Sequence, residues 1–243
     1  YNRLRESIDL PLFNRSLQGQ YPPGSTIKPI MGLAGLHYRV ISPSSSVVDP
    51  GWYQLPNDDR LYRDWKRGGH GAYINLHESI AQSCDIFYYD LAYKLGVDRI
   101  HEFSAQFGLG EATGIDSTSE RSGLLPSREW KRSQRREQWF PGETLNIGIG
   151  QGYMLTTPLQ LAVATATIAN RGVKPVPKLV QPSTELSAKI TLARDQVGPH
   201  LSESKMLHDA GSDGDSGSDD ELANHDIDVV QLNGQRVAED QWN

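Results

Sequence analysis

The stretch Tyr21-Pro-Pro-Gly-Ser-Thr-Ile-Lys-Pro29 is the most informative part of this sequence. A proline fits only into the first turn of a helix, so Pro29 places Ser25 at or near the start of a helix over residues 24–37. That segment is apolar on nearly all sides, which is typical of a buried helix. Ser25 and Lys28 are three positions apart and therefore share a helix face, within hydrogen-bonding reach of each other.

A serine beside a lysine at a helix start has the elements of covalent chemistry. The serine hydroxyl needs a base to become a nucleophile, and a lysine in a desolvated pocket can serve as that base. The N–H groups at the helix start would stabilise an oxyanion. The spacing alone is weak evidence, because Ser202 and Lys205 share it. The buried helix, together with Ser83-Cys-Asp85 at a predicted break between helices, favours Ser25 as the candidate nucleophile.

The first 180 residues predict a helix-rich α/β or α+β domain without internal repeats. Residues 42–74 are rich in proline, glycine, aspartate and aromatic residues, which indicates a long structured loop with short strands. Capping residues and terminating glycines predict helices from 75 to a break at 83–85, then over 86–95, 98–107 and 157–170. Residues 144–153 are too glycine-rich for a helix and indicate backbone packed closely against a neighbour, and Val173–Val180 is prone to form a strand.

The charge distribution separates a domain from a tail. Residues 181–243 hold thirteen acidic and four basic residues, so the net charge of −6 leaves +3 on residues 1–180. Residues 211–221 contain only glycine, serine and acidic residues, a composition that cannot bury enough apolar surface to fold. We therefore expect a folded domain over 1–182 and a largely disordered acidic tail over 183–243.

Cysteine content and hydropathy leave the compartment open. Cys84 is the single cysteine, so an internal disulfide is excluded. The sequence has no run of eighteen apolar residues, so no segment is predicted to span a membrane. The chain begins with Tyr1 rather than methionine, which indicates a fragment of a longer protein whose upstream part could hold an anchor.

Six blocks occur in a fixed order: Y-P-P-G-S-T-I-K-P, D-P-G-W-Y-Q-L-P, Y-R-D-W-K-R-G-G-H-G, T-G-I-D, E-R-S-G-L-L-P-S-R-E-W and G-I-G-Q-G-Y. Together they closely resemble the transpeptidase domain of the penicillin-binding protein 2 family, the class B, elongation-specific D,D-transpeptidases of rod-shaped Gram-negative bacteria. The resemblance covers about residues 1–182. It implies the fold shared by serine β-lactamases and penicillin-binding transpeptidases, an antiparallel sheet flanked by helices, here incomplete at its C-terminal end.

The resemblance also implies roles for individual residues in cross-linking peptidoglycan stem peptides. Ser25 would attack the penultimate D-Ala carbonyl with Lys28 as general base. Ser83 would relay protons toward the leaving group, and Asp85 would position the lysine and the substrate. An amine of a neighbouring stem peptide would then open the acyl-enzyme, whereas a β-lactam would leave Ser25 stably acylated. The substrate-binding positions implied in the same way are Gly24, Gly150, Gln151 and Gly152.

Partners and location follow from the same resemblance. The implied partners are stem peptides ending in D-Ala-D-Ala, β-lactam antibiotics, a membrane glycosyltransferase and other proteins of the rod-elongation complex. The implied location is the periplasmic face of the inner membrane of a Gram-negative bacterium. We expect no nucleic-acid partner, because the basic residues form no stripe with aromatic ones. We expect no cofactor for catalysis.

One element of the family pattern is absent, because no Lys-Thr-Gly or Lys-Ser-Gly occurs in the 243 residues. In the family this motif binds the substrate carboxylate and contributes a backbone N–H to the oxyanion hole. Loss of one oxyanion donor costs on the order of a hundred- to a thousand-fold in rate. Replaced residues from about 183, as after a frameshift, would explain the absence. The alternatives are thus an impaired or inert fragment that acts as a binding or scaffold domain, or a D,D-carboxypeptidase or β-lactamase on the same fold.

Asp49, Asp64, His70 and Cys84 offer four metal donors within 36 residues. Two carboxylates, an imidazole and a thiolate would make a closed four-coordinate zinc site with a structural role. The ordinary interpretation is a small buried cysteine, a histidine in a glycine-rich turn and two aspartates that cap turns. The further candidate donors are Asp58, Asp59 and His77.

Two other groups of residues have simpler interpretations. Trp52, Trp65 and Trp130 are interpreted as packing anchors rather than ligand platforms. The basic run 131–136 is interpreted as a solvated face, with contact to an anionic glycan or a lipid headgroup as the alternative.

Overall fold

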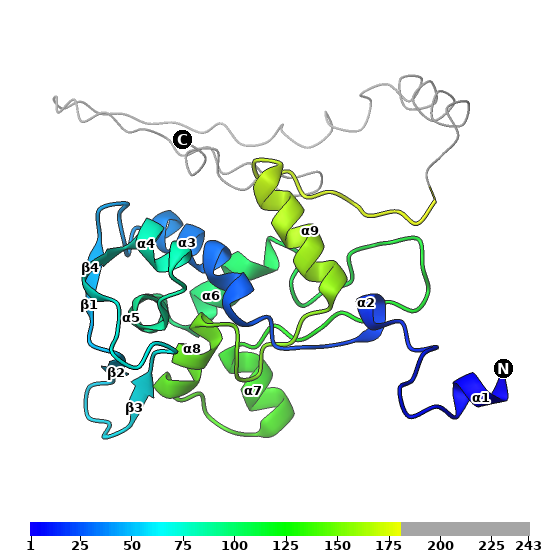
Figure 1. The fold of residues 1–243 in the computed structure, drawn as a ribbon, viewed down its shortest axis with the longest axis horizontal. Helices are drawn as coiled ribbons and strands as arrows, with labels where there is room; N and C mark the ends of the chain where they lie inside the picture. The colour runs from blue at the N-terminus through cyan, green and yellow to red at the C-terminus, as the bar shows by residue number, and fades with distance from the viewer. Residues whose placement is uncertain (181–243) are drawn as a thin grey trace, which may run out of the picture. The chain divides into compact units, whose positions relative to one another are not determined.

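The computed structural model describes residues 1–180, and residues 1–177 belong to one unit that contains every helix and strand below (Figure 1). The helices are α1 (Asn2–Arg5), α2 (Arg15–Gln18), the 3₁₀ helix η1 (Gly24–Ile27), α3 (Lys28–His37), α4 (Leu76–Ala81), α5 (Asp85–Leu95), α6 (Val97–Ala105), α7 (Arg128–Arg135), α8 (Pro141–Gly148) and α9 (Pro158–Ala169). The strands are β1 (Ser46–Asp49), β2 (Trp52–Gln54), β3 (Leu61–Arg63) and β4 (Gly71–Asn75). The tail predicted over 183–243 lies outside the described residues. None of the described helices is long and apolar enough to cross a membrane.

Local sequence signals set most helix boundaries as predicted. The predicted helix over 24–37 forms as η1 followed by α3, with Pro29 in the first turn of α3. The side chain of Asn75 caps α4 by accepting from the Glu78 N–H at 2.9 Å. Thr157 and Gln160 form a reciprocal capping box at the start of α9. Helix α6 ends at Ala105, two residues earlier than predicted.

The predicted loop over 42–74 carries the short strands, and all of them pair antiparallel. β1 pairs with β4 in the register Val47↔Ile74, with an irregularity before Asp49↔Gly71. β2 pairs with β3 in the register Tyr53↔Tyr62. The described strands therefore form two separate two-stranded sheets.

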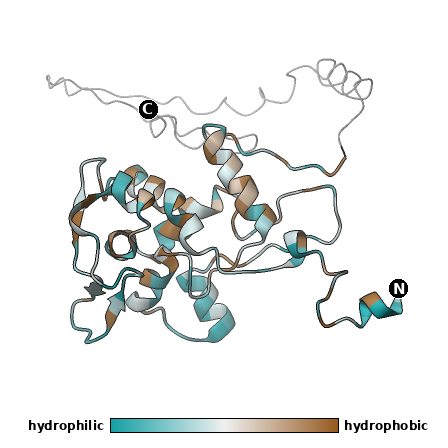
Figure 2. Ribbon diagram, viewed as in Figure 1, coloured by the Kyte–Doolittle hydropathy of each residue, from teal (hydrophilic) through white to brown (hydrophobic). Residues whose placement is uncertain are grey.

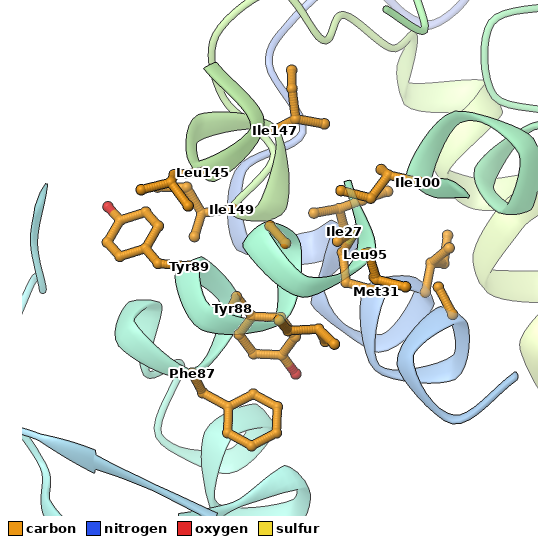
Figure 3. Packing of buried hydrophobic residues seen from close by; sticks show 14 of the residues in the cluster. Ile27, Met31, Phe87, Tyr88, Tyr89, Leu95, Ile100, Leu145, Ile147 and Ile149 are labelled. Carbon is orange, nitrogen blue, oxygen red and sulfur yellow. The ribbon is translucent and has the colours of Figure 1, made fainter. Parts of the chain in front are cut away.

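Helix α5 lies at the centre of the described core. It contacts α3, α4, α6, α8, β1 and β2 (Figure 1). Phe87, Tyr88 and Leu91 are its most buried large side chains. Around it lie Ile27 from η1, Met31 from α3 and side chains from α6 and α8 (Figure 3). Burial of such apolar side chains is worth about 1.5–3 kcal/mol each, so this core fixes the ends of α3 and α5 where the site residues lie.

The prediction that 144–153 are too glycine-rich for a helix is wrong for the first half of that segment. α8 continues to Gly148, whose own lack of a side chain permits the packing of α8 on α5. A Cβ atom on Gly148 would lie 2.5 Å from the Cβ atom of Ala92 and 2.8 Å from the Tyr88 carbonyl oxygen. Tertiary packing therefore outweighs the low helix propensity of glycine here. The predicted close backbone packing is confirmed at Gly148 and at Gly150.

Two further predictions are corrected. Residues 173–180 form no strand. The basic run 131–136 is only partly a solvated face: α7 is predominantly hydrophilic (Figure 2), but the Lys131 side chain is 1% exposed. Its Nζ atom lies 2.5 Å from Glu143 Oε1 and beside the rings of Phe140 and Tyr153. A buried lysine is stable only with such a partner, and the partner comes from another helix, so the sequence pattern gives no sign of it.

Candidate active site

Ser25 is presented to solvent at the start of the helix. Gly24 has a φ of +58°, in the left-handed region that favours glycine, and turns the chain into η1. The Thr26 hydroxyl donates to the Pro23 carbonyl at 2.7 Å and closes the turn. Ser25 is exposed, and its hydroxyl makes no hydrogen bond to any described residue. The hydroxyl is thus available to a ligand that approaches from solvent.

Lys28 is buried beneath this turn, and its ammonium is fully engaged. The side chain is 2% exposed, and Nζ donates to the Ser83 carbonyl at 2.8 Å, the Ser83 hydroxyl at 3.1 Å and Asp85 Oδ1 at 2.7 Å. Nζ also lies 5.2 Å from the centre of the Tyr88 ring. An ammonium has three N–H donors, and each has an acceptor here. The structure therefore brings Lys28, Ser83 and Asp85 together.

The predicted proximity of Ser25 and Lys28 does not lead to a hydrogen bond between their side chains. The two residues do lie three positions apart at a helix start, as the sequence indicates. Their spacing allows contact, but Ser83 and Asp85, which are 55 and 57 residues away in the chain, compete for the same ammonium. A charge-assisted bond to a carboxylate is stronger than one to a hydroxyl, which explains the direction in which Nζ points.

Ser83 occupies a strained turn between α4 and α5. Its φ of +55° is unusual for a residue with a Cβ atom and costs on the order of 1–3 kcal/mol. The turn is held by the Cys84 N–H, which donates to the Ser79 carbonyl at 3.0 Å, and by Asp64 Oδ2, which accepts from the Asp85 N–H at 2.8 Å. The predicted break at 83–85 is thus confirmed, and its geometry directs the Ser83 carbonyl and hydroxyl at Lys28.

The glycine segment after α8 supports the serine turn. The Gly24 N–H donates to the Gly150 carbonyl at 2.8 Å. A Cβ atom on Gly150 would lie 2.3 Å from the Gly24 carbonyl oxygen, so no other residue fits there without movement of the turn. Gln151 and Gly152 are exposed next to this contact. Of the four positions implied for substrate binding, Gly24 and Gly150 therefore meet each other directly.

Asp49, Asp64, His70 and Cys84 converge, and their donor atoms all lie within 4.8 Å of one another. Asp49 Oδ2 lies 2.6 Å from His70 Nδ1 and 3.3 Å from Cys84 Sγ, and Asp64 Oδ2 lies 3.7 Å from His70 Nδ1. Four ligands at the bond lengths of zinc stand about 3.3–3.8 Å apart in a tetrahedron. The alternative donors Asp58, Asp59 and His77 do not belong to this cluster, and His77 is 86% exposed.

The charges of this cluster also suit a cation. Both carboxylates are completely buried, and among the described residues His70 is the only basic side chain within ion-pair distance of either. Buried carboxylates are costly unless they are paired or bind a metal. Burial opposes ionisation of Asp49, but hydrogen bonds from His70, the Gly51 N–H and Cys84 outweigh it and hold the pKa of Asp49 below its ordinary value. Burial raises the pKa of the Cys84 thiol to about 12, and a bound cation would oppose that shift.

The cluster is joined to Lys28 through the chain itself. Cys84 lies between Ser83 and Asp85, and Asp64 accepts from the N–H groups of Asp85 and Ile86 at 2.8 and 3.4 Å. An acidic group at this position is favourable for the first turn of α5. The position of the Asp85 carboxylate therefore depends on the same side chains that form the cluster.

Trp65 is the residue near the site whose role the sequence misses. The interpretation of Trp65 and Trp52 as packing anchors is wrong, since they are 64% and 42% exposed. The indole N–H of Trp65 donates to the Ser83 carbonyl at 3.1 Å. Only its place beside Asp64 in the sequence could have suggested that it lies near the site.

Sequence and fold comparisons define the class of protein. Residues 1–206 match the penicillin binding protein transpeptidase domain family, and the chain belongs to this family. It is 48% identical over 181 residues to the peptidoglycan D,D-transpeptidase MrdA of Acinetobacter baumannii, covering 74% of this chain and 27% of that protein. The chain thus spans about a quarter of the length of this relative.

Solved structures agree with this assignment. Penicillin-binding protein 2 of Pseudomonas aeruginosa, crystallised with WCK 5153, is 54% identical, with a TM-score of 0.73 over 75% of this chain and 41% of that one. Penicillin-binding protein 2 of Helicobacter pylori, in complex with MreC, is 31% identical, with a TM-score of 0.69 over 79% of this chain and 37% of that one. The predicted resemblance and fold class are confirmed.

Proposed function

We propose that this domain is a peptidoglycan D,D-transpeptidase that works through an acyl-enzyme on Ser25 and binds penicillin. One observation carries the proposal: a buried Lys28 ammonium lies between Ser83 and Asp85, at the base of a helix whose first turn presents Ser25 to solvent. A surface serine near an unrelated lysine would not need this arrangement. The similarity to MrdA supplies the reaction class.

In the proposed reaction Lys28 Nζ first gives one proton to solvent. Ser25 Oγ then attacks the carbonyl carbon of the penultimate D-Ala, and its proton passes to Lys28 Nζ. The oxyanion is stabilised by N–H groups at the helix start. The proton then passes through the Ser83 hydroxyl to the nitrogen of the departing terminal D-Ala. The amine of a second stem peptide then attacks the ester carbonyl, and the C–O bond to Ser25 breaks. The proton that the amine loses passes through Lys28 Nζ to Ser25 Oγ. Before the first step, Nζ has to leave one of its present acceptors and turn toward Ser25.

The direct test is covalent labelling by a fluorescent penicillin. We expect about one label per protein, and fragment masses should place the adduct on the peptide that contains Ser25. The sequence has no Lys-Ser/Thr-Gly. We therefore expect the labelling rate to be about a hundred- to a thousand-fold lower than that of a family member with the motif, which is the usual effect of losing an oxyanion donor. Absence of any adduct after prolonged exposure to saturating label would contradict the proposal.

A binding or scaffold domain without turnover is the second candidate, and the missing motif is the observation that favours it. This candidate predicts no adduct but reversible, weak binding of a D-Ala-D-Ala peptide. A D,D-carboxypeptidase or β-lactamase predicts an adduct that water removes. A label that persists after free penicillin is washed away therefore indicates the transpeptidase, because the scaffold domain forms no label and the hydrolase loses it.

Partners and location are proposed from the relatives. We propose that the intact protein works at the periplasmic face of the inner membrane, on stem peptides that end in D-Ala-D-Ala. The Helicobacter relative was solved in complex with MreC, which supports a partner of that kind here. We propose further that a membrane glycosyltransferase and other rod-elongation proteins are partners of the intact protein.

We also propose that Asp49, Asp64, His70 and Cys84 hold a structural zinc ion. The donor types, their convergence within 4.8 Å and two buried carboxylates, for which His70 is the only basic neighbour among the described residues, support this. Zinc would keep Cys84 as a thiolate and join the irregular loop to the turn at Ser83. All four ligands are side chains of the protein, so catalysis at Ser25 involves no metal step in this proposal.

Replacement of His70 by glutamine is expected to remove the zinc. Elemental analysis of the wild-type protein should give about one equivalent, and that of His70→Gln should give almost none. His77→Gln is the matched control, since His77 is exposed and does not belong to the four-donor cluster. At free zinc a thousand-fold above Kd, bound metal stabilises the fold by about 4 kcal/mol, so a chelator should lower the unfolding temperature of wild type but not of His70→Gln. Zinc well below one equivalent in freshly purified wild type would overturn the assignment.

A further inference from the structure

The exposed Trp65 side chain is held in place by the strained turn of the active site. Trp65 follows β3 and is 64% exposed. Its indole N–H donates to the carbonyls of both Gln82 and Ser83, at 3.3 and 3.1 Å. Its ring lies edge-on to the His70 ring at 5.6 Å. An exposed indole N–H can donate to water instead. Burial therefore does not explain why the Trp65 N–H donates to two adjacent carbonyls of the turn.

The Ser83 carbonyl is the point that Trp65 shares with Lys28. This oxygen accepts from Lys28 Nζ at 2.8 Å and from Trp65 Nε1 at 3.1 Å. A carbonyl oxygen has two lone pairs, so these two donors use both. The carbonyl belongs to a residue with a φ of +55°, and strained residues keep such conformations only where their surroundings hold them.

We propose that Trp65 is a positioning residue: its indole N–H fixes the Ser83 carbonyl and thereby the Lys28 ammonium and the Ser83 hydroxyl. Without this bond the turn has one fewer restraint on the side that faces solvent. The carbonyl can then rotate away, and Lys28 Nζ loses one of its three acceptors. The link between Trp65, the Ser83 carbonyl and Lys28 does not depend on the function of the domain, whereas its effect on acylation rests on the proposed function.

The first test is Trp65→Phe, which keeps an aromatic ring beside His70 and removes the N–H donor. We expect the rate constant of labelling by fluorescent penicillin to fall about three- to tenfold, the effect of one hydrogen bond. The final labelled fraction and the zinc content should stay at wild-type values. Trp52→Phe is the matched control, because Trp52 is also exposed and its indole makes no hydrogen bond to a described residue. Wild-type kinetics in Trp65→Phe, or a loss confined to the labelled fraction, would overturn the proposal.

The second test does not require activity. With ¹⁵N-labelled indoles, Trp65→Phe assigns the Trp65 signal. This signal should exchange with water at least about tenfold more slowly than that of Trp52, because of these two indole N–H groups only that of Trp65 donates to a described residue. Lys28→Met removes the other donor to the Ser83 carbonyl and should shift the Trp65 signal. Lys94→Met makes the same change at a surface ion pair and should leave the signal in place.

The two tests separate the two proposals. A rapidly exchanging Trp65 N–H, or a signal that Lys28→Met does not move, overturns the positioning role even if Ser25 is labelled. An unlabelled wild-type protein with a slowly exchanging, Lys28-sensitive Trp65 signal overturns the acyl-enzyme and leaves the link between Trp65, Ser83 and Lys28 intact. The exchange rate is measured on wild type, so the test holds even where Lys28→Met does not fold.

Discussion

Ser25→Ala is expected to form no covalent adduct with penicillin under conditions that label the wild-type protein completely. The exposed Ser25 hydroxyl is the proposed nucleophile, and an alanine offers no atom for the ester. Ser25 makes no side-chain hydrogen bond to a described residue, so its loss should change the free energy of unfolding by less than about 0.5 kcal/mol. Gel fluorescence and intact mass measure the adduct, and urea unfolding measures stability.

The chain supplies a matched control for this experiment. Ser202 begins a second Ser-x-x-Lys that ends at Lys205, so Ser202→Ala makes the same change in the same short pattern. We expect Ser202→Ala to label like wild type. An adduct of full intensity on Ser25→Ala would place the nucleophile elsewhere and exclude Ser25 from the proposed role.

Lys28→Met is expected to lower the rate of acylation of Ser25 by about a hundred- to ten-thousand-fold, the usual contribution of a general base. The substitution keeps an unbranched side chain but removes all three hydrogen bonds of Nζ. It also leaves Asp85, whose side chain is 13% exposed, without its cation. Removal of one partner of a buried ion pair typically costs about 3–5 kcal/mol, so the unfolding free energy should fall by an amount of that order.

Lys28→Arg distinguishes the role of Lys28 as general base from its role as ion-pair partner of Asp85. Arginine keeps the positive charge beside Asp85 but stays protonated, so it cannot accept the proton of Ser25. We therefore expect part of the stability to return while acylation remains slow. The rate is measured from a labelling time course with quenched samples. Acylation of Lys28→Arg at the wild-type rate would show that Lys28 only stabilises the turn.

The sequence alone determined the features that depend on neighbours in the chain. Pro29 in the first turn placed Ser25 at a helix start, the capping box of Thr157 and Gln160 began α9, and Gly96 ended α5. These signals act over three or four residues, because a cap or a proline satisfies or removes backbone hydrogen bonds of the nearest turn. The types of donor at 49, 64, 70 and 84 could also be read from the sequence, although their convergence could not.

The tertiary structure alone decided which groups meet across long separations. It joined Lys28 to Ser83 and Asp85 instead of to Ser25, and it gave the Ser83 carbonyl a second donor from Trp65. It buried Lys131 against Glu143 within a hydrophilic helix. Each outcome depends on which charged or polar group is closest after the core has formed. The periodicity of the sequence does not predict distances between residues that are far apart in the chain. Packing also made a helix of the glycine-rich end of α8, because at Gly148 the absent Cβ atom is what allows contact with α5.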